Sequence, residues 1–205
     1  MKAIILAAGA ASRMAYKALL PMKNLQPVIF SAINYANGYV REQDITVIVS
    51  PGPLQKIISA SYPGVKFIVE TEKLGVLGAI AALPRGQYMI LCCDNIYPDD
   101  ENLDLWTGVY LRRVYGKKHG LIVWDEERKF YTREEIDSNV VLSTPWVFDS
   151  LDIVAAKEWI ANGGSPDDVV GFFNEHKPPQ TYIGPYGIWC DIGTPESYQE
   201  YWDAH

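Results

Sequence analysis

The stretch Met1-Lys-Ala-Ile-Ile-Leu-Ala-Ala-Gly9, followed by Ala10-Ala-Ser-Arg13 and Lys17-Ala-Leu-Leu-Pro21, decides the fold. Its apolar run predicts a buried first strand that ends in a tight loop. Side chains are almost absent from that loop, so its backbone can approach a ligand closely. The hydroxyl of Ser12 and the two cations that follow suit a polyphosphate. Taken alone, the segment also fits a strand, a turn of small residues and two solvated basic side chains.

Strands and helices alternate along the chain beyond this segment. Apolar and β-branched runs predict strands at 2–6, 44–50, 65–70, 88–93 and 120–124. Helices are predicted between them at 27–36, 54–61, 77–83 and 102–114. This alternation predicts an α/β fold: a mostly parallel central sheet with helices on both faces, in three α/β/α layers.

The pattern changes after Glu126. Strand-like stretches at 129–133 and 139–143 precede helices at 147–161 and 166–174, a last strand at 187–190 and a terminal helix. With 205 residues the chain is long enough for one domain with a sizeable core. We predict a single domain over 1–205, with two parts, 1–125 and 126–205, that differ in pattern.

Composition limits the function classes. The net charge of −7 makes nucleic acid or an anionic membrane surface an unexpected partner. No stretch reaches the roughly 18 apolar residues that a membrane span requires, and the apolar start lacks a cleavage site typical of a signal peptide. The three cysteines, two of them adjacent, argue against a disulfide framework. We therefore expect a cytoplasmic protein, and a homo-oligomer is left open.

Two segments identify a known family. Leu6-Ala-Ala-Gly9, Ser12-Arg13-Met14, Lys17 and Leu19-Leu20-Pro21 resemble the signature of the nucleotidyltransferase superfamily. This superfamily includes sugar-1-phosphate nucleotidylyltransferases, choline-phosphate cytidylyltransferases and molybdopterin-type transferases. The segment Trp189-Cys-Asp-Ile-Gly-Thr-Pro-Glu-Ser-Tyr198 resembles the W-x-D-I-G-T-P-E-x-Y segment of the sugar nucleotidylyltransferases. The first motif has its short form here, and Ala11 stands where relatives often carry Gly or Ser. The resemblance implies a Rossmann-like nucleotidyltransferase fold, in which 1–125 would bind the NTP and 126–205 would bind the acceptor.

The resemblance also implies a magnesium site. Asp94 follows an apolar strand where the family carries a metal-binding aspartate, and Asp191 matches the family's second metal ligand. Two carboxylates with phosphate oxygens in the other positions suit Mg²⁺. Asp94 alone could instead cap a turn, and residues 194–196 also read as the start of a helix. We expect Cys93 and Cys190 to be packed small side chains, because neighbouring side chains of a strand alternate between faces.

A third segment, 70–80, resembles the part of the family that lies against the base and ribose. Glu70 stands about where many relatives have Gln, and Val76 replaces the usual Thr. A carboxylate only accepts hydrogen bonds, so Glu70 at the base would favour CTP or GTP over UTP and dTTP. A solvated charge is the alternative for Glu70. The family's Glu-Lys-Pro segment is absent, which leaves the acceptor unidentified, with Arg133 or Lys129 as possible substitutes.

These observations predict a Mg²⁺-dependent enzyme that transfers a nucleoside monophosphate from an NTP to a phosphorylated sugar or small alcohol phosphate, with release of pyrophosphate. Arg13 and Lys17 are the expected catalytic residues, and we expect Arg13 and Asp94 to lie in solvent-facing loop positions at the edge of the sheet. The expected nucleotide-binding residues are Leu6, Ala7, Ala8, Gly9, Ala10, Ser12, Glu70, Gly75 and Asn95, and the expected metal ligands are Asp94 and Asp191.

Two other function classes remain open at this point. One is a non-catalytic nucleotide-binding regulatory domain of the same fold. The other is a nucleotide-sugar glycosyltransferase, although such enzymes normally show an Asp-x-Asp pair and Cys93-Asp94-Asn95 offers one acid.

Overall fold

The computed structural model describes residues 1–9, 16–98, 108–113, 121–134, 138, 140–176, 183–184 and 189–204. The chain forms two compact units. The first consists of Met1–Lys73, Tyr88–Leu103 and Ile188–His205, and the second of Leu74–Gln87 and Asp104–Gly187. The two units therefore interleave along the chain and do not coincide with the predicted halves 1–125 and 126–205, whose separate roles stay a prediction.

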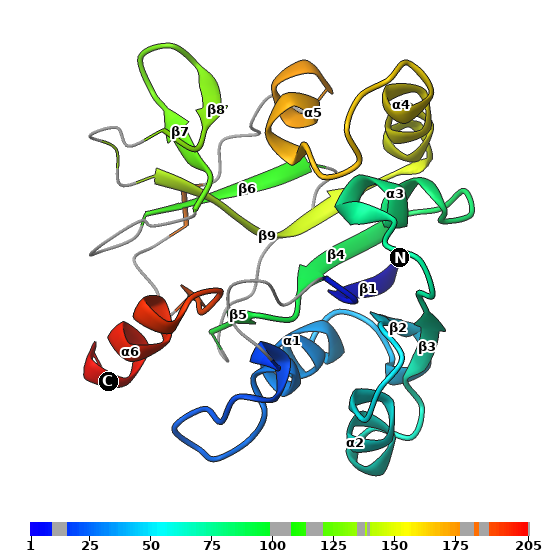
Figure 1. Ribbon diagram of the computed structural model, residues 1–205, viewed down its shortest axis with the longest axis vertical. Coiled ribbons are helices and arrows are strands. Elements are labelled where there is room, and N and C mark those ends of the chain that lie inside the picture. Colours follow the sequence, from blue (N-terminus) through cyan, green and yellow to red (C-terminus); the bar gives the residue numbers. More distant parts are fainter. Residues whose placement is uncertain are drawn as a thin grey trace. The chain divides into compact units, whose positions relative to one another are not determined.

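The first unit contains a parallel sheet (Figure 1). Its strands, in the order β4-β1-β2-β3, are β4 (Tyr88–Cys92), β1 (Lys2–Ala7), β2 (Ile45–Val49) and β3 (Lys66–Val69). Ile5 pairs with Val47 on one side and with Leu91 on the other, and all three side chains are fully buried. The four strands lie where the hydrophobic pattern predicts them.

Helices of the first unit also follow the sequence. The short 3-10 helix η1 (Lys17–Leu19) precedes α1 (Val28–Asn37), which packs against β1, β2 and β4. Beyond these lie η2 (Glu42–Asp44), α2 (Leu54–Ser61) and the C-terminal α6 (Pro195–Ala204). The α6 start is the predicted one, because the Thr194 side chain accepts a hydrogen bond from the Ser197 N–H at 3.2 Å.

A two-stranded sheet joins distant parts of this unit. Strand β5 (Asn95–Ile96) pairs antiparallel with β11 (Cys190–Asp191), 95 positions later in the sequence. A small core of buried side chains holds the pair against α1 and α6, namely Met22, Val28, Ile96, Ile192 and Tyr201. The C-terminal residues therefore belong to the same unit as the N-terminal strand.

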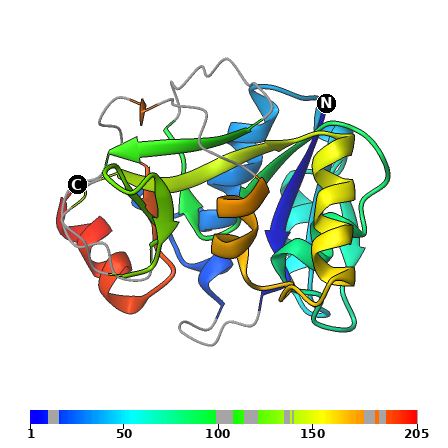
Figure 2. The same ribbon diagram turned by 90° about the horizontal axis from the view of Figure 1, so that it is seen from above.

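The second unit is a mixed α/β assembly. Its strands are β6 (Gly108–Arg113), β7 (Val123–Asp125), β8 (Phe130–Thr132), β9 (Val140–Phe148) and β10 (Ile183–Gly184). Figure 2 shows β6 and β9 as two long neighbouring strands, and their pairing is antiparallel. The helices are α3 (Gly75–Ala81), α4 (Ser150–Ala161) and α5 (Val169–His176). Helix α3 packs on α4, and α5 packs on β8.

Several predicted helices differ from the structure, and the helix predicted at 166–174 is α5, which begins at Val169. The helix predicted at 102–114 is wrong for 108–113, which form β6; residues 99–107 and 114 lie outside the described part. Val109, Tyr110 and Leu111 favour a strand once a partner is present, and β9 supplies it. The helix predicted at 147–161 starts instead at Ser150, because β9 continues to Phe148 and Asp149 forms a capping box with Asp152.

The α/β class and the mostly parallel strands of the first unit are confirmed. Cys92, Cys93 and Cys190 are free cysteines. Among the described residues, no helix has the length and apolar character that crossing a membrane requires.

Candidate functional site

The loop after β1 begins at the carboxyl end of the parallel sheet. The Leu6 carbonyl accepts a hydrogen bond from Cys93 N–H at 3.2 Å, and the Ala8 carbonyl accepts one from the Ser50 hydroxyl at 2.9 Å. Gly9 is exposed, and a Cβ built on it would meet no atom within 4 Å. Space for a ligand is therefore present beside the backbone of Gly9. Ala10, Ser12 and Arg13 lie outside the described residues.

Lys17 and Asp94 form an ion pair at this end of the sheet. The Lys17 ammonium, at the start of η1, donates to Asp94 Oδ2. The side chains are only 20% and 12% exposed. Burial lowers the pKa of Lys17, but the negative charge of Asp94 beside it outweighs this effect and raises the pKa above its ordinary value. Lys17 is therefore a cation held among negative groups.

The turn after β4 is what places Asp94. The Tyr97 hydroxyl accepts a hydrogen bond from Cys92 N–H at 3.2 Å, so the chain folds back on itself across Asp94. Tyr97 is fixed in turn by α1, where the Ser31 hydroxyl accepts from Tyr97 N–H at 2.8 Å and the Tyr35 ring stacks on the Tyr97 ring with centroids 4.7 Å apart. Asp94 is 8% exposed. The expectation that Asp94 lies in a solvent-facing loop is wrong, because this turn buries the residue near the ends of the strands.

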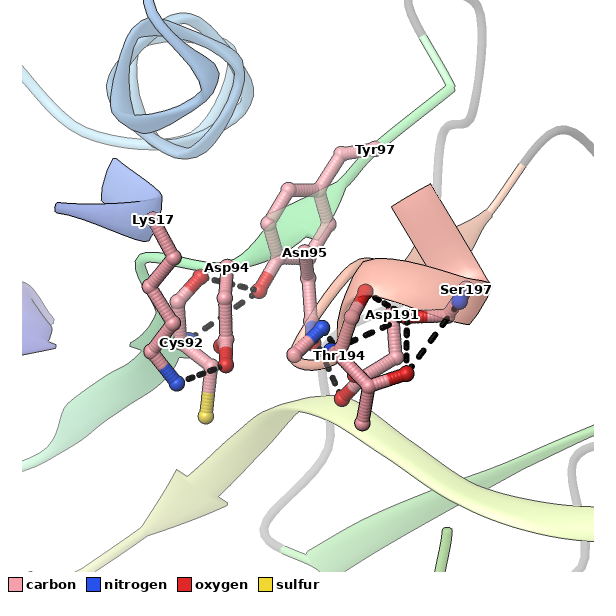
Figure 3. A network of polar contacts seen from close by, with 9 residues as sticks. Lys17, Cys92, Asp94, Asn95, Tyr97, Asp191, Thr194 and Ser197 are labelled. Atoms are coloured by element: carbon pink, nitrogen blue, oxygen red, sulfur yellow. Dashed lines mark hydrogen bonds and ion pairs between the residues drawn. The ribbon is translucent and has the colours of Figure 1, made fainter. Parts of the chain in front are cut away.

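Strand β11 brings Asp191 to the same place (Figure 3). In the β5–β11 pair Asp191 stands opposite Asn95, and the Asn95 amide donates to Asp191 Oδ2 at 3.3 Å. The Gly193 N–H donates to Asp191 Oδ1 at 2.8 Å. One residue further, the Ile192 N–H donates to the Asp94 carbonyl at 2.9 Å. The structure therefore brings together four of the residues named from the sequence: Lys17, Asp94, Asn95 and Asp191.

Neighbouring cysteines do not extend this cluster. Burial, with the charge of Asp94 next, raises the pKa of Cys93 to about 12, and burial raises that of Cys190 to about 11. Cys93 is buried, and Cys190 packs against the core around Ile96 and Ile192. Both thiols are therefore neutral near pH 7 and pack as small apolar side chains do, as expected from the sequence.

The donor set fits Mg²⁺. Asp94 and Asp191 offer carboxylate oxygens, which are the hard ligands that Mg²⁺ prefers, usually one or two from protein with phosphate oxygens and water completing the shell. No group of three or more His, Cys, Asp or Glu side chains suited to a metal occurs among the described residues. A metal held by this cluster would therefore depend on a bound phosphate for further ligands.

Glu70 and Gly75 lie apart from the cluster in the sequence. Glu70 follows β3, its N–H donates to the Val49 carbonyl at 2.8 Å, and its side chain is half-buried. Gly75 starts α3 in the second unit with φ +74°, and a Cβ there would lie 2.9 Å from the Pro166 carbonyl oxygen. A local packing reason for this glycine therefore exists, and its role in nucleotide binding stays a prediction.

Sequence reasoning missed the contacts that hold the cluster. The Lys17–Asp94 and Asn95–Asp191 contacts and the Ser31 support of Tyr97 join segments 66 to 96 positions apart. The only signal was the rule that ligands bind at the carboxyl ends of parallel strands, and it places Asp94 without naming its partner.

Comparison with known proteins supports the fold. No protein-family model matches the chain, and no curated protein matches it in sequence. Solved structures do match over nearly its whole length. A Bacillus anthracis protein provisionally assigned as a glucose-1-phosphate thymidylyltransferase is 20% identical with a TM-score of 0.73, over 98% of this chain and 93% of that one.

Two cytidylyltransferases match similarly. CTP:phosphocholine cytidylyltransferase from Streptococcus pneumoniae is 18% identical with a TM-score of 0.66, over 99% of this chain and 98% of its own. The inositol-1-phosphate CTP transferase from T. maritima is 13% identical with a TM-score of 0.67, over 96% and 90%. At these identities the shared property is the fold. The chain has the Rossmann-like fold of the nucleotidyltransferase superfamily, so the resemblance seen in the sequence is confirmed at that level.

Proposed function

We propose that this chain is a Mg²⁺-dependent nucleotidyltransferase, which transfers a nucleoside monophosphate from an NTP to a small phosphorylated acceptor and releases pyrophosphate. The observation that carries the proposal is the cluster of Lys17, Asp94 and Asp191 at the strand ends of a nucleotidyltransferase fold. One cation and two carboxylates from three distant segments lie at the carboxyl ends of the strands. Ligands of α/β sheets bind at this end. The three side chains are suited to a ligand that carries both phosphate and a divalent metal.

The transfer needs one bond made and one broken. An oxygen of the acceptor phosphate attacks the α-phosphorus, and the bond from that phosphorus to the bridging oxygen of the β-phosphate breaks, so that pyrophosphate leaves with the electron pair. The acceptor oxygen is already anionic near pH 7, so no general base is required. Positioning and charge stabilisation supply the rate acceleration.

The chain's residues divide this work. The Lys17 ammonium neutralises charge that develops on the triphosphate, and Arg13 assists in that role as the sequence motif implies. Backbone N–H groups of the loop that includes Gly9 and Ser12 hold phosphate oxygens. Asp94 and Asp191 would hold Mg²⁺, which supplies electrostatic stabilisation of the reacting phosphates when bound.

The test is pyrophosphate release with each of the four common NTPs over a panel of acceptors. The panel includes glucose 1-phosphate, phosphocholine and inositol 1-phosphate, because structurally similar enzymes are named for these compounds. Lys17→Met and Arg13→Ala should each lower turnover at least about a hundredfold. Lys56→Met, on the exposed side of α2, is the matched control and should leave turnover unchanged. Binding of Mg²⁺-NTP without turnover on any acceptor would favour a regulatory nucleotide-binding domain instead.

Nucleotide sugars give a further arm of the same experiment. Incubation with a nucleotide sugar and pyrophosphate should regenerate an NTP, since the reaction is reversible. Transfer of the sugar without consumption of pyrophosphate would instead identify a glycosyltransferase and overturn the proposal.

Base choice is a finer part of the proposal. If the Glu70 carboxylate meets the base, CTP or GTP should exceed UTP and dTTP by roughly ten- to hundredfold in kcat/KM, since opposed buried acceptors cost about 1–3 kcal/mol. We favour CTP because the short loop motif resembles cytidylyltransferases. Glu70→Gln should relax the preference, because an amide offers a donor as well as an acceptor. UTP as the best substrate of the wild type would contradict this role of Glu70.

A further inference from the structure

We infer that Asn95 is a positioning residue, whose buried carboxamide fixes the Asp191 carboxylate in the orientation that a divalent metal requires. The inference rests on the proposed function, because it needs Asp191 to be a metal ligand. It departs from the direct nucleotide contact that the sequence predicts for Asn95.

The contacts around Asp191 support this role. Each carboxylate oxygen has its own donor: Oδ1 accepts from Gly193 N–H at 2.8 Å and Oδ2 accepts from the Asn95 amide at 3.3 Å. Two donors on different atoms fix the plane of the carboxylate. A carboxylate has about four lone-pair sites, so these two hydrogen bonds do not by themselves prevent contact with a cation.

Burial separates this role from a direct contact with nucleotide. Asn95 is 3% exposed, whereas Asp191 is partly exposed. The side chain that a ligand can reach is therefore the carboxylate, and the amide lies behind it. Figure 3 shows the Asn95 side chain pointing to Asp191 across the β5–β11 pair.

The residue type also fits. A neutral donor at position 95 leaves Asp191 ionised and keeps its negative charge available to a metal. A lysine or arginine there would neutralise the carboxylate and compete with the cation, and an aspartate would repel it. Asn95 also follows Asp94 directly and pairs with Asp191 across the strands, so the one residue links both proposed ligands.

The experiment measures Mn²⁺ binding to the full-length protein, with free Mn²⁺ counted from its EPR signal and no nucleotide present. Asn95→Ala should weaken Mn²⁺ binding by about tenfold, within the range of 10–100-fold typical for residues that orient a metal ligand. The matched control is Asn34→Ala on α1, which removes an asparagine whose Oδ1 accepts from the Tyr62 hydroxyl at 2.7 Å. Its Mn²⁺ affinity should equal that of the wild type.

Substitutions of matched size separate positioning from a merely structural role. Asn95→Leu keeps the approximate volume of the side chain but has no donor, so it should weaken Mn²⁺ binding as much as Asn95→Ala does. Asn95→Gln keeps an amide donor and should bind Mn²⁺ more tightly than either variant. All affinities are compared below the unfolding temperature of the least stable variant.

The outcomes distinguish the inference from the function on which it rests. If Asp191→Asn and Asp94→Asn weaken Mn²⁺ binding while Asn95→Ala binds like the wild type, the positioning role is wrong and the metal site stands. An Asn95→Gln protein that binds Mn²⁺ no better than Asn95→Leu would also overturn it. If neither aspartate variant changes Mn²⁺ binding, the metal site of the proposed function fails and the role of Asn95 fails with it.

Discussion

Asp94 combines burial, an ion pair and a proposed metal contact in one carboxylate. It is 8% exposed, and its partner Lys17 lies among negative groups that hold the ammonium charged. When one charge of such a pair is removed, the other charge stays largely buried and has no partner of opposite charge. Replacement of Asp94 therefore has a structural consequence in addition to a chemical one.

Asp94→Asn should lower turnover at least about a hundredfold, because the proposed metal site loses a charge. It should also lower the free energy of unfolding by about 1–3 kcal/mol, since Lys17 is left with an uncharged neighbour. Chemical denaturation measures the second effect. The double variant Lys17→Met with Asp94→Asn should regain most of the stability and none of the activity. An Asp94→Asn protein as stable as the wild type would contradict the importance of the ion pair.

At the site, the sequence names candidate residues but does not predict the contacts that hold them. Asp94 and Asp191 stand out because each follows an apolar strand within a family motif. Their neighbours depend on long-range contacts: Lys17 reaches Asp94 across 77 positions and Asn95 reaches Asp191 across 96. No periodicity in a single sequence records such pairs, so the burial of Asp94 was also missed.

Among the elements, the four parallel strands were predictable because each is a run of β-branched or apolar residues between clear turn residues. Strand β6 was not, because Val109, Tyr110 and Leu111 fit a buried helix as well as a strand. Its identity comes from pairing with β9, where Val109 stands opposite Trp146 and Leu111 opposite Leu142. Partner choice of this kind overrides local propensity.

Gly75, at the start of α3, can be compared with Gly163, which follows α4. Gly75 has φ +74° and Gly163 has φ +90°, but a Cβ on Gly75 would lie 2.8 Å from Asp167 Oδ1 whereas one on Gly163 meets nothing within 4 Å. Both alanine variants carry the cost of a left-handed backbone, about 1–2 kcal/mol. Gly75→Ala should lose at least about 1 kcal/mol more, from overpacking. Urea unfolding of the two variants measures the difference, and equal losses would contradict the close packing at Gly75.

Strand β8 contains a buried phenol that makes the second unit sensitive to alkali. The Tyr131 hydroxyl has no hydrogen-bond partner among the described residues, and burial raises its pKa well above its ordinary value. The unfolded chain loses this proton near pH 10 and the folded chain only at higher pH. The contribution of Tyr131 to the free energy of unfolding is therefore fully present below about pH 10, and it falls as the pH rises above that value.

Tyr131→Phe should remove that loss. The variant should unfold less readily than the wild type above pH 10, and it should gain about 1 kcal/mol near pH 7 because an unsatisfied hydroxyl is removed. Stability curves from pH 7 to pH 11 provide the measurement. Tyr16→Phe, at a residue 73% exposed, is the control and should change neither value. A destabilised Tyr131→Phe protein would indicate that the hydroxyl has a partner.

At the scale of the whole molecule, the first unit depends on both ends of the described chain. Helix α6 is bonded to the segment that follows Lys17: the Tyr198 hydroxyl donates to the Pro21 carbonyl at 2.8 Å, and the Lys23 N–H donates to the Tyr201 hydroxyl at 3.1 Å. The Lys23 ammonium also lies 6.0 Å from the centre of the Tyr201 ring and 5.8 Å from that of Trp202. These contacts hold β11, and with it Asp191, in the unit.

Replacing both tyrosines by phenylalanine should therefore lower the unfolding temperature of the protein. Each hydrogen bond contributes about 1 kcal/mol, which corresponds to roughly 2–4 °C in a domain of this size. The double variant Tyr198→Phe with Tyr201→Phe should unfold at a temperature lower by about 4–8 °C, as followed by circular dichroism. An unchanged midpoint would mean that apolar packing alone holds α6.

The late position of β11 also constrains synthesis of the protein. A ribosome that has translated the first 187 residues has released all four strands of the parallel sheet, Lys17 and Asp94, but not Asp191 or the helix that follows it. During that interval the nascent chain lacks one of the two carboxylates and leaves Met22, Val28 and Ile96 without the side chains that cover them. A product that terminates before β11 would therefore lack one of the two proposed metal ligands and would expose these apolar side chains to proteolysis.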